Sequence, residues 1–145
     1  MTTSLSSETV HASTVAIKGR AVLIAGRSGA GKSDLTLRLI DRGAALVSDD
    51  YTIVRRVGGR LVAGAPTTIT GRIEVRGIGL VEMQTESDAA VALFVDLDAA
   101  VERLPEPGET RMLAGIAIPV VRLTAHEASA PIKVELALTR FGLPA

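Results

Sequence analysis

The chain has 145 residues, of which 47% are apolar, and it carries 16 basic and 16 acidic side chains. This length corresponds to one domain, and the apolar content argues against a disordered protein. The absence of cysteine excludes disulfides and thiolate metal sites. Zero net charge, with two Phe, one Tyr and no Trp, argues against a nucleic-acid-binding protein, which needs basic surfaces and rings for base stacking.

The first residues predict neither a leader sequence nor a membrane anchor. Residues 1–8 are polar, lack the basic and apolar regions of a signal peptide, and are expected to form a flexible N-terminus. The apolar runs that follow have the length of strands and fall far short of the roughly 20 residues of a membrane-spanning helix. We therefore expect a cytoplasmic protein without a membrane contact, in which residues 9–145 form a single domain.

The first half of that domain predicts strands interrupted by one helix. Strands are expected over residues 10–17, 21–25, 45–48, 51–57 and 60–65. Residues 33–42 predict a helix, and Gly43 directly after them is a typical stop signal. Gly58-Gly59 lies between the last two strands and is a strong signal for a two-residue β-hairpin.

The second half predicts more strands and a final helix. The expected elements are a strand mixed with loop over residues 73–81, a strand over 89–97, a loop over 104–108, a strand over 116–123 and a helix over 131–140. Pro119 indicates that its strand lies at an edge of the sheet, because proline has no N–H to donate. The pattern as a whole predicts an α/β fold: a mixed sheet with antiparallel hairpins and few helices.

A phosphate-binding loop is the clearest motif. The pattern G-x-x-x-x-G-K-[ST] is matched by eight consecutive residues: Gly26, Arg27, Ser28, Gly29, Ala30, Gly31, Lys32 and Ser33. An apolar strand precedes the motif and a predicted helix follows it, as such a P-loop requires. The glycines let backbone N–H groups point at phosphate oxygens, the lysine places a positive charge on the β- and γ-phosphates, and the serine hydroxyl can bind Mg²⁺. The motif therefore predicts nucleotide-phosphate binding.

Two adjacent carboxylates, Asp49 and Asp50, end the strand that follows the predicted helix. Ligands of open α/β sheets bind at the carboxyl ends of strands, so this pair is expected beside the P-loop. Neighbouring side chains on a strand alternate in direction, which allows one carboxylate to lie near Mg²⁺ and the other near an acceptor hydroxyl. A solvated Asp-Asp turn is the alternative interpretation.

The glycine-rich stretch over residues 71–79 contains two further candidates, Glu74 and Arg76. Glu74 could add a carboxylate that faces the metal, and Arg76 could pair with phosphate. The alternative is a strand with glycine bulges whose charged side chains face water. The residue types alone leave both interpretations open.

Two more side chains are weaker candidates. If residues 10–17 and 21–25 form a hairpin, His11 lies close to the phosphates, where an imidazole can relay a proton at neutral pH. A histidine on the surface at the end of a strand is the alternative. Arg103 flanks the Pro-Gly loop and could reach an anionic substrate, although most loop arginines are solvated. His126 lies in a polar loop and is expected to be inert.

Taken in order along the chain, these motifs resemble the catalytic domain of HPr kinase/phosphorylase. The resemblance covers about residues 9–142, and its most specific part, Ile73-Glu74-Val75-Arg76-Gly77-Ile78-Gly79, is similar to the signature stretch of that family. The family's N-terminal domain has no counterpart in this sequence. The chain therefore resembles a short form, with one P-loop kinase catalytic domain over residues 9–145.

The resemblance implies a role for each matching residue. Lys32 matches the lysine that holds the transferred phosphoryl group, and Ser33 and Glu74 match the Mg²⁺ ligands. Asp50 matches the aspartate that takes the proton from the acceptor serine and returns it in the reverse reaction. His11 and Arg103 match a histidine of the active centre and an arginine that contacts the serine or its phosphate. The supporting positions are Asp49, Arg76, Pro119 and Arg122, of which Pro119 and Arg122 lie in a segment tied to the phosphorylase direction.

The resemblance also implies the reaction and the partners. The expected activity is ATP- and Mg²⁺-dependent phosphorylation of a serine on a small HPr-type phosphocarrier protein of a phosphotransferase system, together with phosphorolysis of the product. A homo-oligomer, a hexamer by resemblance, is expected, and no nucleic-acid or membrane partner. ATP, GTP and pyrophosphate stay open as phosphoryl donors. A P-loop kinase of a small metabolite and a non-catalytic nucleotide-binding regulator are the alternative functions.

Overall fold

The structure is a computed structural model that describes residues 6–145. Eleven strands and two α-helices build it. The strands are β1 (Ser7–Val10), β2 (Ala12–Ile17), β3 (Arg20–Ala25), β4 (Ala45–Ser48), β5 (Thr52–Val57), β6 (Arg60–Gly64), β7 (Arg72–Val75), β8 (Gly79–Glu82), β9 (Ala89–Asp96), β10 (Thr110–Leu113) and β11 (Ile116–Arg122). The helices are α1 (Lys32–Asp41) and α2 (Ala130–Phe141), and Thr67–Ile69 form a 3₁₀ turn. This mixed sheet with antiparallel hairpins confirms the predicted fold class.

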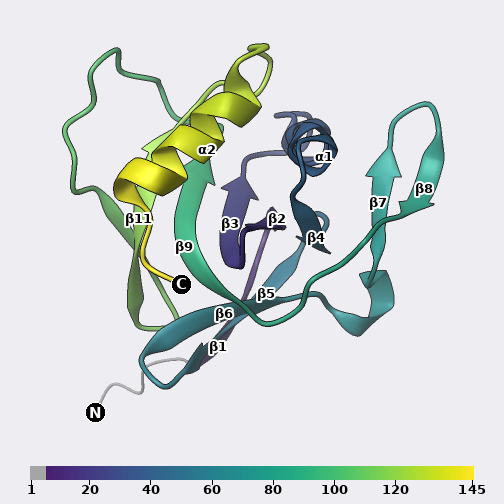
Figure 1. Cartoon of the computed structure of the whole chain (residues 1–145), viewed down its shortest axis with the longest axis horizontal. Helices are drawn as coiled ribbons and strands as arrows, with labels where there is room; N and C mark the ends of the chain where they lie inside the picture. Colours follow the sequence, from purple (N-terminus) through teal and green to yellow (C-terminus); the bar gives the residue numbers. More distant parts are fainter. Residues whose placement is uncertain (1–5) are drawn as a thin grey trace.

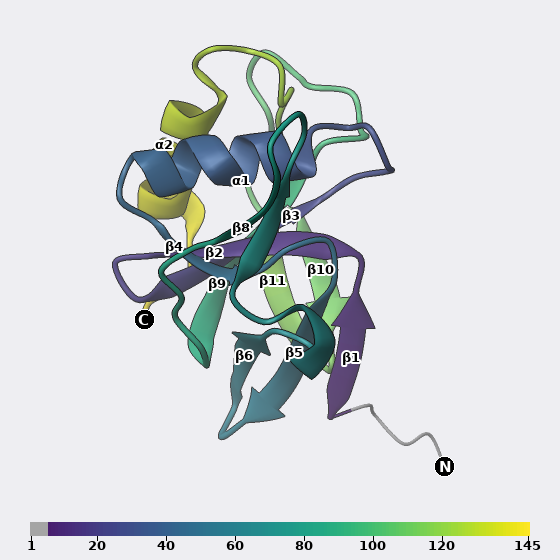
Figure 2. The ribbon, with the colours of Figure 1, turned by 90° about the vertical axis from the view of Figure 1, so that its right-hand side faces the viewer.

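The strand that leads into the P-loop, β3, lies in the interior of a nine-stranded sheet. The order along the main path is β1-β5-β6-β9-β3-β2-β4. Strand β3 runs parallel to β9 and antiparallel to β2. On the other edge of β9, β6 pairs with its first residues and β11 with its last ones. The sheet therefore divides into two arms at β9, which Figures 1 and 2 show as β6-β5-β1 and β11-β10.

Strand β3 is buried on both faces. Val22 and Ile24 face the apolar cluster formed with α1 and α2, whereas Ala21 and Leu23 face the cluster on the opposite side of the sheet. The two helices lie side by side over the first face, and the β1-β5-β6 arm lies below the second (Figures 1 and 2). Because strands buried on both faces are held by packing from two sides, the P-loop starts from a fixed point.

Both predicted helices form, within one residue of their expected ends. Helix α1 begins after Gly31, whose φ is 99°, and the N–H of Gly43 donates to the carbonyl of Ile40 at 3.0 Å beyond its end. That glycine has a φ of 109°, the left-handed conformation expected of a helix stop. Within residues 6–145, neither helix has the length and apolar character that crossing a membrane requires.

The predicted glycine turn between β5 and β6 also forms. Gly58 and Gly59 have φ values of 56° and 80°, the pair of positive angles that a tight hairpin turn of this hand needs. The stretch predicted as strand mixed with loop is a separate hairpin, β7–β8, which stands beside α1 (Figures 1 and 2).

The N-terminal prediction is wrong for two residues. Residues 1–5 of the expected flexible segment lie outside the described residues, whereas Ser7 and Glu8 belong to β1 and pair antiparallel with β5. The Glu8 carboxylate also accepts the backbone N–H of Ala114 at 2.7 Å. Main-chain pairing does not require apolar side chains, so the polar composition concealed this strand. His11 separates β1 from β2, where one continuous strand was predicted.

The prediction that Pro119 marks an edge strand is also wrong. Strand β11 pairs with β10 through Ile116–Pro119 and then with β9 through Val120–Arg122. Pro119 lies at the residue where the strand changes partners, with Thr110 of β10 opposite it. A missing N–H is tolerated there because the pairing with β9 starts only at Val120.

Candidate active site

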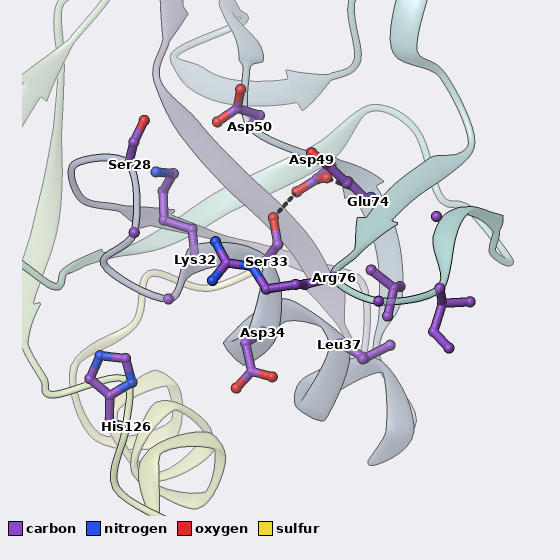
Figure 3. A pocket seen from close by; sticks show the side chains of 16 residues that line it. Ser28, Lys32, Ser33, Asp34, Leu37, Asp49, Asp50, Glu74, Arg76 and His126 are labelled. Atoms are coloured by element: carbon purple, nitrogen blue, oxygen red, sulfur yellow. Dashed lines mark hydrogen bonds between the residues drawn. The ribbon is translucent and has the colours of Figure 1, made fainter.

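A cavity of 840 Å³ opens between the P-loop, the start of α1, the end of β4 and the β7–β8 hairpin (Figure 3). The residues that line it come from sequence segments far apart. They are Ser28, Gly29, Gly31, Lys32, Ser33, Asp34, Leu37, Asp49, Asp50, Glu74, Val75, Arg76, Gly77, Ile78, Gly79 and His126. The structure therefore brings together the P-loop, the aspartate pair and the glycine-rich stretch, as the sequence predicted.

The P-loop lysine is folded over its own loop. Lys32 is 6% exposed, and its ammonium group donates to the carbonyls of Gly26 at 2.7 Å and Arg27 at 3.2 Å. Gly29 and Gly31 have φ values of 85° and 99°, which curl the backbone around the cavity. An ammonium has three donors, so the two described contacts leave one for a ligand.

Asp98, which follows β9, holds the first turn of the P-loop. Both of its carboxylate oxygens accept the backbone N–H of Arg27, at 2.9 and 3.1 Å. Its own N–H donates to the Asp96 carboxylate at 2.9 Å, which fixes the turn after β9. Because β3 and β9 are parallel neighbours, their carboxyl ends meet here.

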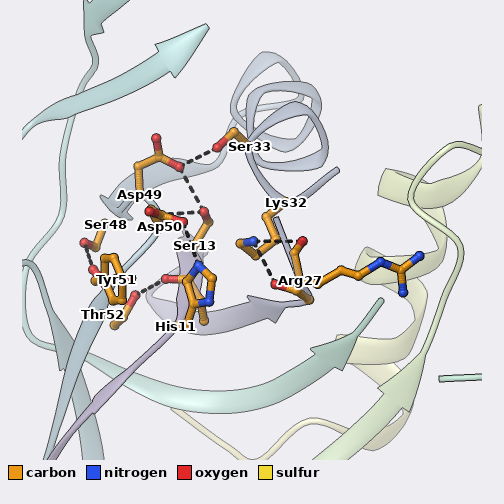
Figure 4. Close-up of polar contacts among 12 residues, drawn as sticks. His11, Ser13, Arg27, Lys32, Ser33, Ser48, Asp49, Asp50, Tyr51 and Thr52 are labelled. Carbon is orange, nitrogen blue, oxygen red and sulfur yellow. Dashed lines mark hydrogen bonds and ion pairs between the residues drawn. The ribbon is translucent and has the colours of Figure 1, made fainter. Parts of the chain in front are cut away.

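Asp49 joins four elements through one buried carboxylate (Figure 4). It is 7% exposed, and its Oδ1 accepts the hydroxyls of Ser13 on β2 at 2.9 Å and Ser33 on α1 at 2.8 Å. Its Oδ2 accepts the backbone N–H of Glu74 on β7 at 3.0 Å. Three donors satisfy a charge that would otherwise be costly to bury.

Asp50 points the other way. Its side chain is 55% exposed, and its Oδ1 lies 2.9 Å from Nε2 of His11, whose ring stacks on that of Tyr51 with centroids 4.9 Å apart. An ionised carboxylate only accepts hydrogen bonds, so a His11 ring with its proton on Nε2 is the tautomer that matches this contact. The backbone N–H of Asp50 donates to the Ser13 hydroxyl at 2.9 Å, and its φ of 67° turns the chain between the two aspartates. One carboxylate is thus fixed inside the site and the other is open to an approaching molecule.

The oxygen atoms around Ser33 fit a magnesium ion. Mg²⁺ prefers hard oxygen ligands, keeps several waters and takes few groups from the protein. The Ser33 hydroxyl and the Asp49 carboxylate are in contact, and Glu74 lines the same wall of the cavity. No cluster of three or more acidic or histidine side chains able to hold a metal occurs within residues 6–145. Mg²⁺ usually takes one or two protein ligands and completes its shell with phosphate oxygens and water, and Ser33 and Glu74 could supply such a pair.

Besides Gly26, Arg27 and Ala30 of the P-loop, and His11 beside Asp50, three predicted side chains do not line the cavity. Arg103 is exposed in the loop between β9 and β10. This loop starts at the end of β9, beside the P-loop (Figure 2). Pro119 lies within β11, and the Arg122 guanidinium pairs with the Glu109 carboxylate at 2.8 Å. These positions lie outside the group of residues around Lys32.

Three residues around the site were missed or set aside by sequence reasoning: Ser13, Asp98 and His126. Ser13 is a buried serine in a strand, and nothing in the sequence distinguishes it. Asp98 could have been found, because it follows a buried strand at the sheet edge where the P-loop also starts. His126 was expected to be inert, yet it lies on the cavity wall.

Comparisons with known proteins identify relatives of this chain. The family model of the HPr Serine kinase C-terminal domain matches residues 3–141. The HPr kinase/phosphorylase of Chlorobium chlorochromatii is 34% identical over 127 residues, which cover 78% of this chain and 38% of that protein. That of Caldanaerobacter subterraneus is 42% identical over 78 residues, which cover 53% of this chain and 26% of that protein.

A solved structure extends the agreement to the fold. The Hpr(Ser) kinase/phosphatase from Coxiella burnetii matches with a TM-score of 0.79 and 27% identity, over 92% of this chain and 89% of that chain. The chain spans 38% of the Chlorobium chlorochromatii relative and smaller shares of others, such as 26% of the Caldanaerobacter protein. Because the family model matches nearly the whole chain and the fold is shared, the chain belongs to the HPr kinase/phosphorylase family, whose C-terminal domain it matches.

Proposed function

We propose that this chain transfers the terminal phosphoryl group of ATP to a serine hydroxyl of an HPr-type phosphocarrier protein. The observation that carries the proposal is the difference in burial and in hydrogen-bond partners between two neighbouring aspartates. Asp49 is buried against Ser33 of the P-loop, whereas Asp50 is exposed at the same cavity and paired with His11. A kinase of a protein serine needs such an exposed base, because its acceptor arrives on the surface of another molecule.

The residues of the chain have distinct tasks in this reaction. The P-loop N–H groups and the Lys32 ammonium hold the phosphates and neutralise the charge that develops during transfer. Asp50 accepts the proton of the serine hydroxyl. The serine oxygen meanwhile attacks the γ-phosphorus, and the bond between the γ-phosphorus and ADP breaks. His11 donates its Nε2–H to Asp50 and orients that carboxylate. In the reverse direction, Asp50 returns the proton to the serine as the phosphoryl group passes to inorganic phosphate and gives pyrophosphate.

Ser33 and Glu74 would hold Mg²⁺, with Asp49 accepting the Ser33 hydroxyl. A bound Mg²⁺ supplies charge neutralisation at the β- and γ-phosphates. Arg76 lines the cavity from the β7–β8 hairpin, where its guanidinium can pair with phosphate. The wider parts of the proposal, a homo-oligomeric assembly and a cytoplasmic location, rest on the family alone.

A transfer assay tests the proposed function. The purified chain is incubated with labelled ATP, Mg²⁺ and a purified HPr-type phosphocarrier protein, and the modified residue is mapped by mass spectrometry. We expect label on one serine of the phosphocarrier protein, and Lys32→Ala should lower the rate by at least about 10²-fold with the fold intact.

Two controls separate the alternatives. A parallel panel of small hydroxyl metabolites should stay unlabelled, and labelling there instead would favour a small-metabolite kinase. Binding of ATP without transfer or hydrolysis would favour a nucleotide-binding regulator. Undiminished transfer by Lys32→Ala would remove the P-loop from the mechanism.

A further inference from the structure

His126 lies at the end of the cavity away from Asp50. In Figure 3, Lys32 and Ser33 stand between these two side chains. His126 belongs to the loop between β11 and α2, and its imidazole lies against the P-loop: a Cβ atom at Gly31 would be 3.6 Å from its Cε1 atom. The ring therefore borders the phosphate site directly.

The proposed transfer sets the direction in which a nucleotide lies. The acceptor hydroxyl must meet Asp50, so the terminal phosphate lies between Asp50 and Lys32. The α-phosphate, the ribose and the base then extend from the P-loop away from Asp50. Figure 3 shows Asp34 and His126 on that side of the cavity.

The side chains on this wall of the cavity suit stacking on the face of a nucleotide base better than hydrogen bonding to its edge. His126 has the one aromatic ring among the cavity-lining residues of the described chain. The Asp34 carboxylate accepts the Arg38 Nε–H at 3.0 Å and is already engaged. His126 is exposed, and no polar contact within residues 6–145 holds its ring, so the ring can meet a ligand.

The loop that carries His126 is anchored on both sides of this residue. The Arg38 guanidinium donates to the carbonyls of Ala125 and of Glu127, the latter at 3.0 Å, and Ala125 is only 2% exposed. The Glu127 carboxylate in turn accepts the Lys133 ammonium at 3.1 Å. An anchored loop loses little conformational freedom when a ligand binds, which favours affinity.

We propose that His126 forms the nucleoside end of the site by stacking its imidazole on the base of the nucleotide. The inference rests on the proposed function, which sets the direction of the phosphates. Every base has a π-face, so stacking accepts any nucleoside di- or triphosphate with little choice of base. Stacking by His126 thereby adds affinity for the nucleoside to the affinity that the P-loop gives the phosphates.

Paired ligands test this role. Calorimetry measures the Kd of ADP and of pyrophosphate, each with Mg²⁺, for the wild type, His126→Ala and His126→Phe. The two ligands have equal numbers of phosphates, and only ADP has a nucleoside. For His126→Ala we expect the Kd of ADP to rise about tenfold, the size of one base–ring stack, while that of pyrophosphate changes by less than about twofold. His126→Phe keeps a ring and should bind ADP within about threefold of the wild type.

Several results would overturn the proposal. An unchanged Kd of ADP in His126→Ala would do so, as would a wild type that binds pyrophosphate and not ADP. Equal weakening of both ligands would mean that His126 acts by shaping the P-loop around Gly31. Failure of the proposed function is a separate outcome, visible as normal ADP binding without transfer to the phosphocarrier protein.

Discussion

Asp49 and Asp50 are chemically identical neighbours with opposite surroundings. Asp49 accepts three hydrogen bonds and is 7% exposed, whereas the Asp50 side chain is 55% exposed and contacts His11. The positive φ of Asp50 produces this difference, because it turns the backbone between the two side chains. The same substitution should therefore affect mainly stability at position 49 and mainly turnover at position 50.

Asp49→Asn should destabilise the fold by about 1–3 kcal/mol, whereas Asp50→Asn should change stability by less than about 0.5 kcal/mol. An amide at position 49 can accept the two serine hydroxyls through its oxygen, but its NH₂ group then faces the N–H of Glu74. Asparagine tolerates the left-handed backbone of position 50. Urea unfolding of both variants measures the difference, and equal losses would contradict the hydrogen-bonding account of Asp49.

The rate of phosphoryl transfer should depend strongly on the carboxylate of Asp50. We expect Asp50→Asn to bind ATP like the wild type and to transfer phosphate about 10²–10⁴-fold more slowly, the usual contribution of a general base. Nucleotide binding by calorimetry and the transfer assay provide the two readouts. Unchanged turnover would rule out Asp50 as the base.

At the scale of elements, the P-loop depends on close approach to the loop between β11 and α2. Gly29 and Gly31 both have positive φ, yet only Gly31 is crowded: a Cβ there would lie 2.9 Å from the Cβ of Ala125, and nothing lies within 4 Å of one at Gly29. Helix α2 is further joined to α1 by the Arg42–Glu135 ion pair at 2.7 Å. The hydrogen bonds that Arg42 donates to the Glu135 carboxylate, together with the charge of that carboxylate, raise the pKa of Arg42 above its ordinary value.

Comparing alanine at the two glycines isolates that contact. Each substitution puts a side chain on a left-handed backbone, at a cost of about 1–2 kcal/mol. Gly31→Ala also pushes against Ala125 and should cost about 1–3 kcal/mol more, with weaker pyrophosphate binding. Thermal or urea unfolding and calorimetry measure both effects, and equal behaviour of the two variants would contradict the packing argument.

At the scale of the whole molecule, β9 is the strand on which the two arms of the sheet meet. It pairs with β3, β6 and β11, and Phe94 near its end is 2% exposed in the cluster below the sheet. The guanidinium of Arg111 lies 4.4 Å from the centre of the Phe94 ring and covers it. Stability of the whole fold should therefore depend on this ring.

Phe94→Ala should lower the free energy of unfolding by about 3–5 kcal/mol, a large share of the roughly 5–15 kcal/mol of an ordinary domain. Met112→Ala, on a side chain that is 62% exposed in β10, is the matched control and should change it by less than about 0.5 kcal/mol. Urea unfolding at constant m-value compares the two. If Phe94→Ala lowered the free energy of unfolding by less than about 1 kcal/mol, the Phe94 ring would not be a main part of the core.

Local signals were sufficient where one short segment decides the structure. The P-loop, the helix stop at Gly43 and the hairpin turn at Gly58-Gly59 were predictable because glycine adopts their positive φ angles without steric cost and each signal lies in one short segment. The same signals failed for Ser7–Val10 and for Pro119, because those depend on strand partners far away in the sequence.

A phosphate-binding loop and the carboxylates beside it were predictable from the amino-acid sequence alone. The different surroundings of the two aspartates arise in the folded chain: Ser13, Ser33 and Glu74 converge on Asp49 from three elements, whereas Asp50 contacts His11. The tertiary structure also placed His126 on the wall of the cavity and Arg103 outside it. The physical reason is that burial and hydrogen-bond partners, which set what a carboxylate or an imidazole can do, are contributed by residues distant in the chain.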